Sequence, residues 1–220
     1  MRTRLIAVSV SLLLGSLLPA TAFGRVIEGQ TGRPESRRTL LKKTYADIEI
    51  REQRRARSRR DSPLNALVVL QPWNISLRYP STWDLDAQAM TEGNVTLAAL
   101  LLSPVVSGSD TRQNINLVVE DLSDAPLTLT QYTEEALRRE REYLADFTLL
   151  SRDRGTVAGE RADIIQFTAS FAGIPLRYEQ AWFLRDDKAY VLTFTDSSET
   201  FGTNLPTFRA VTESMTFPAR

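Results

Sequence analysis

The pattern of apolar and polar side chains in the middle of the chain predicts three β-strands. Residues 75–79 alternate between the two types, which is the period of a half-buried strand. Pro80 ends this strand, because proline cannot donate a hydrogen bond to a sheet ladder. Residues 95–102 are almost continuously apolar and predict a buried central strand, closed by Pro104, and residues 115–119 alternate again. Since no helical pattern separates the three strands, we expect antiparallel pairing.

The following segment predicts an amphipathic helix from Thr130 to Phe147. Thr128 and Gln131 have the spacing of a capping box, and Thr130 is the alternative N-cap. The opposite side of the apolar stripe carries charges spaced for ion pairs, and we place Glu140 among them. The pattern is typical of a surface helix with one face in solvent.

The C-terminal third predicts a β-meander followed by a helix. Turn residues at Ala172–Gly173 and Asp186–Asp187 separate alternating runs, and such an arrangement indicates hairpins. The last helix should begin near Pro206, because proline suits a first helical turn. The three strands are expected at 163–169, 176–184 and 190–195, with cross-strand contacts among Phe167, Tyr178, Trp182, Tyr190 and Phe194, and with Met215 to Phe217 closing the sheet.

Together these elements predict an α/β fold with a mainly antiparallel sheet and two principal helices. We expect one domain over residues 66–220. Trp83 follows the strand that Pro80 ends, and we expect its ring to anchor the core at the edge of the sheet.

Residues 1–22 have the anatomy of a secretory signal peptide. Arg2 and Arg4 precede an apolar run, and small residues stand where a signal peptidase cleaves, with Ala22 as the preferred site. The run is shorter than the roughly 20 residues that span a bilayer, so retention as an anchor is the weaker alternative. The absence of cysteine excludes lipid attachment and favours a domain stabilised by its core alone. We expect export to a bacterial periplasm or the extracellular space, or to a thylakoid lumen in a photosynthetic organism.

Residues 23–65 predict a basic arm or linker that is largely disordered. From residue 25 to residue 65 there are 12 lysines and arginines against 6 acidic residues, whereas residues 66–220 carry 13 against 21. Large apolar side chains are sparse in this segment, so it cannot bury enough surface to offset the entropy of ordering. Candidate partner-docking residues are its clustered arginines Arg51, Arg54, Arg55, Arg57, Arg59 and Arg60.

The basic arm could attract an anionic membrane surface or an acidic protein. Export argues against nucleic acid, and no aromatic side chains interleave the arginines for base stacking.

The composition excludes much familiar catalytic chemistry. The chain has no histidine and no cysteine, so the common nucleophile–base pairs and imidazole or thiolate metal sites cannot form. Acidic residues cluster at 120–124 and 84–86 without the spacing of a known calcium loop. We therefore expect no enzyme activity, no cofactor and no metal site.

Short motifs in a fixed order resemble the PsbP-like superfamily, which includes PsbP, DcrB-type and Mog-type proteins. The matching positions are Ile75 to Trp83 with its Tyr-Pro-x-x-Trp motif, Leu129-Thr130-Gln131-Tyr132, Gly159-Glu160-Arg161-Ala162, Gln180 to Leu184, Ala189 to Thr195, and Ser214-Met215-Thr216-Phe217. This resemblance implies an α/β/α sandwich with a central, mainly antiparallel sheet flanked by helices, which agrees with the elements predicted above. It also implies a non-enzymatic accessory or binding protein that engages a protein partner, in a photosystem-related or envelope-related role. The alternative is a periplasmic protein that binds a small ligand or a divalent cation.

Overall fold

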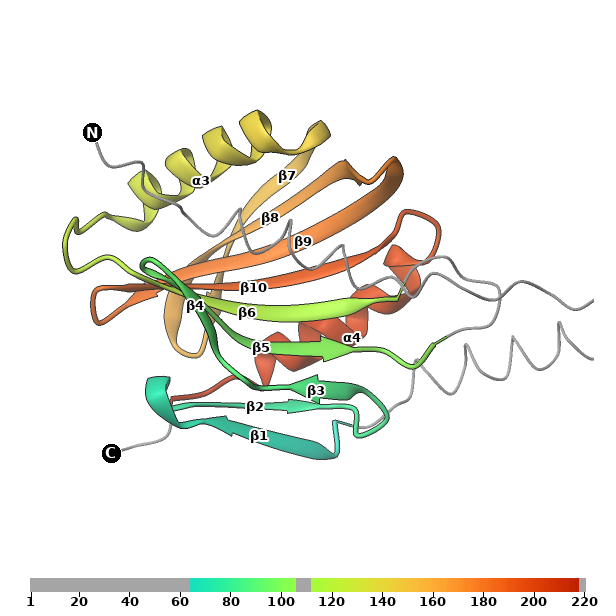
Figure 1. The fold of residues 1–220 in the computed structure, drawn as a ribbon, viewed down its shortest axis with the longest axis horizontal. Helices are drawn as coiled ribbons and strands as arrows, with labels where there is room; N and C mark the ends of the chain where they lie inside the picture. Colours follow the sequence, from blue (N-terminus) through green and yellow to red (C-terminus); the bar gives the residue numbers. More distant parts are fainter. Residues whose placement is uncertain (1–63, 106–111, 218–220) are drawn as a thin grey trace, which may run out of the picture. The chain divides into compact units, whose positions relative to one another are not determined.

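The computed structural model describes residues 64–105 and 112–217 (Figure 1). The expected signal peptide and nearly all of the basic arm, including its six candidate arginines, lie outside the described residues. Within these ranges, no helix is long and apolar enough to cross a membrane.

The main sheet has eight strands, and all of its described strand pairs are antiparallel, as the sequence predicted. Its order is β3–β5–β6–β10–β9–β8–β7, and β4 pairs with β5 off this path. The strands are β3 (Asp84–Asp86), β4 (Met90–Glu92), β5 (Val95–Leu102), β6 (Asn114–Asp121), β7 (Ala145–Val157), β8 (Glu160–Phe171), β9 (Ile174–Arg185) and β10 (Lys188–Ser197).

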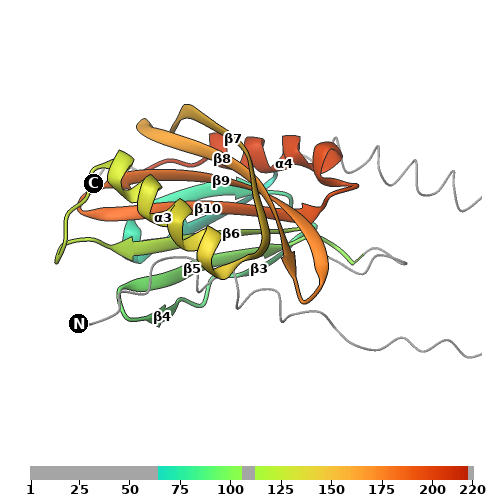
Figure 2. The same ribbon diagram turned by 90° about the horizontal axis from the view of Figure 1, so that it is seen from above.

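Two helices pack on opposite faces of this sheet (Figure 2). Helix α3 (Leu129–Tyr143) contributes to an apolar cluster with β8, β9 and β10, and helix α4 (Phe201–Glu213) contributes to a second cluster on the other face. The fold is thus a mainly antiparallel sheet flanked by helices, which confirms the predicted fold class.

A separate two-stranded sheet completes the α4 side. Strand β1 (Ala66–Leu70) pairs with β2 (Ile75–Tyr79), so the strand that ends before Pro80 does not join β5 and β6 in the main sheet. The segment from Met215 to Phe217 does not close the main sheet either, because Thr216 bridges Ser76 of β2. A short 3-10 helix, Gln71–Trp73, links β1 to β2.

The strand predicted over residues 95–102 is buried but not central. Strand β5 lies between β6 and the short strands β3 and β4, close to one edge of the sheet. Its side chains reach both apolar clusters, and a register shift between Leu97 and Ala99 changes the face on which the following residues lie. Burial on both faces explains the continuous apolar sequence.

The predicted end of the first helix is wrong. Helix α3 ends at Tyr143, Leu144 has extended backbone angles, and Phe147 belongs to β7, a strand that the sequence did not predict. Thr128 does form the capping box with Gln131, as expected, since its hydroxyl oxygen accepts from the Gln131 N–H at 3.3 Å.

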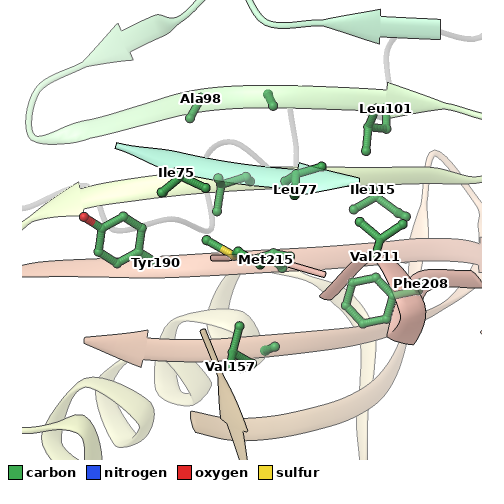
Figure 3. Packing of buried hydrophobic residues seen from close by; sticks show 14 of the residues in the cluster. Ile75, Leu77, Ala98, Leu101, Ile115, Val157, Tyr190, Phe208, Val211 and Met215 are labelled. Carbon is green, nitrogen blue, oxygen red and sulfur yellow. The ribbon is translucent and has the colours of Figure 1, made fainter. Parts of the chain in front are cut away.

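The last helix begins earlier than predicted, at Phe201, and Pro206 lies inside it. Proline removes one intrahelical donor, but the helix tolerates it because an apolar stripe holds it on the sheet. Phe194 of β10 stacks on Phe208 with ring centroids 5.5 Å apart and contacts Phe201 at 5.1 Å. Figure 3 shows side chains from β2, β5, β6, β10 and α4 converging in this cluster.

Aromatic side chains divide between the two faces instead of forming the single set predicted. Phe167 and Tyr178 stack at 4.7 Å beneath α3, where Trp182 also lies. Tyr190 and Phe194 point to the opposite face. The reason is the register between β9 and β10. Trp182 pairs with Val191, and paired residues point to the same face. Because successive side chains of a strand alternate between faces, Tyr190 and Phe194 of β10 point to the opposite face.

Candidate functional site

The acidic residues singled out in the sequence are held apart by the fold. Glu120 is buried and accepts a hydrogen bond from Asn94, whereas Asp121 is exposed and accepts from the Ser123 N–H and the Ser123 hydroxyl. These Ser123 bonds, with Lys188 as a lesser contributor, lower the pKa of Asp121 to about 2. Asp84 instead pairs with Arg112. Across the described ranges, no group of three or more acidic side chains could hold a metal ion.

The most unusual set of polar side chains lies beneath helix α3. We call it the α3 polar seam, and define it as Glu120, Tyr132, Thr133, Glu140, Asp163 and Gln180. Three of the five buried residues of α3 are polar, and each meets a polar partner on the sheet. Because buried polar groups need partners, these contacts fix where the helix docks.

The N-terminal half of the seam is fully paired. The Tyr132 hydroxyl donates to Glu120 of β6 at 3.2 Å, and burial, followed by the charge of Glu120, raises the pKa of Tyr132. The hydroxyl of the next residue, Thr133, donates to Asp163 of β8 at 2.7 Å. Asp163 is neutralised by Arg152 of β7 at 3.1 Å.

The C-terminal half of the seam is incompletely paired. Glu140 is 4% exposed and its carboxyl receives a hydrogen bond from Gln180 of β9, but its Oε2 atom has no hydrogen-bond partner. Burial raises the pKa of this carboxyl to about 8. Gln180 is itself fixed, because it accepts from the Trp182 indole at 2.9 Å and donates to Thr193 at 3.2 Å.

The charge pattern of the sequence predicted Glu140 on the solvent side of the helix and gave no indication of this seam. Its spacing held the signal, since Tyr132, Ala136 and Glu140 follow one another at four-residue intervals on one helix face. A glutamate in that row belongs to the buried stripe. The sequence does not reveal its partner, because Gln180 lies 40 residues further along the chain.

A second feature with functional potential is the surface of strand β1. All five of its residues are apolar, and they alternate between the core and solvent. Val68 and Leu70 are buried, whereas Leu67 is 56% exposed and Val69 is 43% exposed. In the part of the chain that the structure describes, β1 pairs along one edge only, with β2. Among the described residues it therefore has both an unpaired strand edge and an apolar outer face.

Strand β7, the edge strand at one end of the main sheet, is built differently. It also pairs on one side among the described residues, with β8, but it carries Arg152, Asp153 and Arg154 and has two register shifts. Charges and bulges are the usual protection of an edge against added strands. Strand β1 has neither, so its edge lacks that protection.

A small pocket of about 180 Å³ lies at the β9–β10 turn. Its apolar wall includes Leu122 and Leu184, and its charged members are already engaged: Arg185 with Glu160, and Lys188 with Asp121. The volume is below the roughly 300–1,000 Å³ of most ligand pockets.

Comparison with known proteins gives a likeness of fold. No family model matches the sequence, and no curated protein matches it. The solution structure of cyanobacterial PsbP from Synechocystis sp. PCC 6803 matches with a TM-score of 0.52 at 10% identity, over 70% of this chain and 92% of that one.

Two other matches are weaker. A protein of unknown function from Pseudomonas aeruginosa gives a TM-score of 0.48 at 17% identity, covering 70% of this chain and 97% of that one. LpqN of Mycobacterium tuberculosis, which is involved in cell envelope biogenesis, gives 0.45 at 14% identity, covering 66% of this chain and 83% of that one. The arrangement of sheet and helices, together with the match to cyanobacterial PsbP, establishes that this chain has a PsbP-like fold.

Proposed function

We propose that this chain is an exported accessory protein without catalytic activity, and that it binds a protein partner through the outer face and free edge of strand β1. The observation that carries the proposal is the exposure of Leu67 and Val69 on a strand with no polar side chain. The PsbP-like fold supports a binding role, and the signal-peptide pattern of residues 1–22 supports export.

The physical argument concerns the cost of leaving such a strand uncovered. A strand that is apolar on both faces is usually buried on both faces. Here one face packs into the core through Val68 and Leu70, while the other face meets solvent. Covering an apolar side chain releases about 25 cal/mol per Å², and a partner strand would also satisfy the free backbone groups of the edge.

The test uses a photoreactive amino acid, p-benzoylphenylalanine, in place of Leu67 in the full chain expressed in its own organism. Leu150 of β7 is the matched control position, because it is an exposed leucine, 46% accessible, on the protected edge. We expect a discrete cross-linked product at position 67 and none at position 150. Products at both positions, or at neither, would contradict the assignment of β1.

Measurements on the purified proteins then distinguish a loss of partner binding from a loss of folding stability. Threonine keeps a high strand propensity and removes apolar surface. The double variant Leu67→Thr, Val69→Thr should keep the melting temperature of the wild type and bind the cross-linked partner at least tenfold more weakly. Leu150→Thr should bind it like the wild type. Unchanged affinity in the double variant would exclude this surface.

A further inference from the structure

Helix α3 is held on the sheet by apolar packing and by hydrogen bonds between polar side chains. Tyr132, Thr133 and Glu140 each reach across to a different strand, and the apolar contacts of the buried face come from Ala136, Leu137 and the ring of Tyr132. An interface of this kind depends on the protonation state of its members more strongly than an apolar one does. Glu140 is the member whose carboxyl is not fully paired.

Among the described residues, no cation lies beside the carboxyl of Glu140 on the sheet side. Its sheet partner is the neutral amide of Gln180, and Tyr178 of β9 lies close enough for the charge of Glu140 to raise its pKa, which burial brings to about 12. On α3 itself, Arg141 favours the ionised form but is outweighed by burial. A carboxylate at this position would therefore be buried without an ion-pair partner among the described residues of the sheet, an arrangement that proteins avoid.

The other charged groups under α3 belong to different contacts. Asp163 of β8 and Arg152 of β7 pair with each other beside Thr133, which lies seven residues, or about two helical turns, before Glu140. Glu120 of β6 accepts from Tyr132.

We propose that the docking of helix α3 is controlled by proton binding at Glu140. While the carboxyl is protonated, the helix lies closed on the sheet. When the proton leaves, hydration of the carboxylate favours a state in which the C-terminal half of α3 has moved off the sheet. That movement uncovers Tyr178 of β9, which lies near Glu140 and stacks on Phe167.

The direction of the pH effect follows from linkage. The pKa of Glu140 is about 8 with the helix docked, against an ordinary value of 4.5 when the side chain is in water. The docked state therefore binds the proton more tightly than the open state. The free energy by which protonated Glu140 favours docking is fully present below about pH 4.5 and declines as pH rises towards 8. Between these limits the equilibrium constant for opening should rise by about tenfold per pH unit, with no further rise above pH 8.

Hydrogen exchange measured by mass spectrometry on the full chain between pH 5 and pH 9 tests the proposal. After correction for the intrinsic exchange rate, protection of a peptide covering Leu129–Tyr143 should fall by about tenfold per pH unit up to pH 8. Protection of a peptide covering α4 is the internal control and should exceed that of α3 at every pH, because α3 opens without unfolding the rest of the domain. Equal protection of the two helices at every pH would indicate global unfolding and would overturn the proposal, as would constant protection of α3.

Two variants test whether ionisation of the Glu140 carboxyl causes the pH dependence. Glu140→Gln has nearly the same shape and cannot ionise, so the protection of α3 should no longer depend on pH. Glu142→Gln removes an exposed carboxylate from the same helix, where its side chain is 53% accessible, and should keep the wild-type profile. If Glu140→Gln kept the wild-type profile, another group would be responsible. If that variant failed to fold, the comparison of exchange protection between α3 and α4 in the wild type would still test whether α3 opens separately.

Discussion

The hydroxyl group of Tyr132 donates a hydrogen bond to the carboxylate of Glu120 at 3.2 Å, and both side chains are buried. This contact joins helix α3 to strand β6, which lies at the far side of β10 from the strands that α3 covers directly. The Tyr132 ring also meets Trp182 edge-on, with centroids 6.2 Å apart. One residue thus carries both a polar and an aromatic contact between the helix and the sheet.

Replacing Tyr132 by phenylalanine keeps the ring and removes the hydroxyl. Glu120 then loses one donor while remaining buried, and hydrogen bonds to charged groups contribute about 1.5–3 kcal/mol. We expect a loss of that size in the free energy of unfolding from urea titration. Tyr143→Phe is the control, because Tyr143 is 54% exposed and its change should stay within about 0.5 kcal/mol. Equal effects of the two substitutions would mean that the buried bond contributes nothing.

A buried carboxylate on the other face of the sheet makes a second prediction. Glu179 is 2% exposed and accepts two hydrogen bonds from Arg209 of α4, at 3.0 and 2.8 Å. Arg209→Met keeps most of the aliphatic stem but leaves the carboxylate with Gln166 as its remaining described donor. We expect a destabilisation of about 1–3 kcal/mol, the cost of a buried group left under-paired.

The double variant provides the check. In Glu179→Gln, Arg209→Met no charge remains buried, so part of the lost stability should return, and the two substitutions should couple. If the losses in the free energy of unfolding were additive, the two side chains would have no coupling energy and the ion pair would not contribute to stability.

Local signals predicted much of the fold. The capping box at Thr128 depends on contacts three residues apart, and the turn at Ala172–Gly173 depends on backbone angles that the sequence specifies. Strand β7 was missed for a physical reason. Its register shift between Leu149 and Ser151 interrupts the two-residue period, and Phe147 happens to fit the helical spacing of the preceding stripe.

The candidate sites were harder to predict because each depends on tertiary contacts. Glu140 looks like any charged residue of a surface helix until Gln180 is placed beneath it. Leu67 and Val69 look like core residues because their strand is uniformly apolar, and the sequence does not say that one face stays uncovered. The acidic residues near 120 were noticed, but the pleat of β6 sends Glu120 and Asp121 to opposite sides.

The acid side of the stability profile should depend on Asp121. The pKa of Asp121 is lowered to about 2 from 3.8. Its contribution to the free energy of unfolding is therefore present above about pH 4 and is lost as pH falls towards 2. Its side chain is 46% exposed, so the effect should be small. The melting temperature of Asp121→Asn should lie below that of the wild type at pH 5, and the two should converge at pH 2. Asp124→Asn, a neighbouring exposed carboxyl, is the control. A difference in melting temperature between Asp121→Asn and the wild type that stayed constant from pH 5 to pH 2 would show that ionisation of Asp121 does not contribute to stability.

The basic arm gives a prediction that is independent of the folded domain. Its six clustered candidate arginines should draw the full chain to anionic vesicles, and salt should weaken that binding because exposed charges are screened within about 8 Å at physiological ionic strength. In sedimentation with phosphatidylglycerol vesicles, we expect binding at low salt that is lost at high salt and in a variant lacking residues 25–60. Phosphatidylcholine vesicles are the control. Salt-independent binding, or full binding by the shortened variant, would contradict an electrostatic arm.

The last prediction compares two tryptophans in different environments. Trp182 is 1% exposed beneath α3, whereas Trp83 packs against the opposite cluster and is only partly buried. Trp83 therefore reaches the core, as its position after Pro80 suggested, but it removes less surface from water. Truncating a fully buried aromatic side chain costs about 3–5 kcal/mol, and we expect that loss for Trp182→Ala. For Trp83→Ala we expect about 1–3 kcal/mol, the usual range for a destabilising substitution. Urea titration of both variants decides the matter: a loss at Trp83 equal to that at Trp182 would show that its contacts are worth more than its burial indicates.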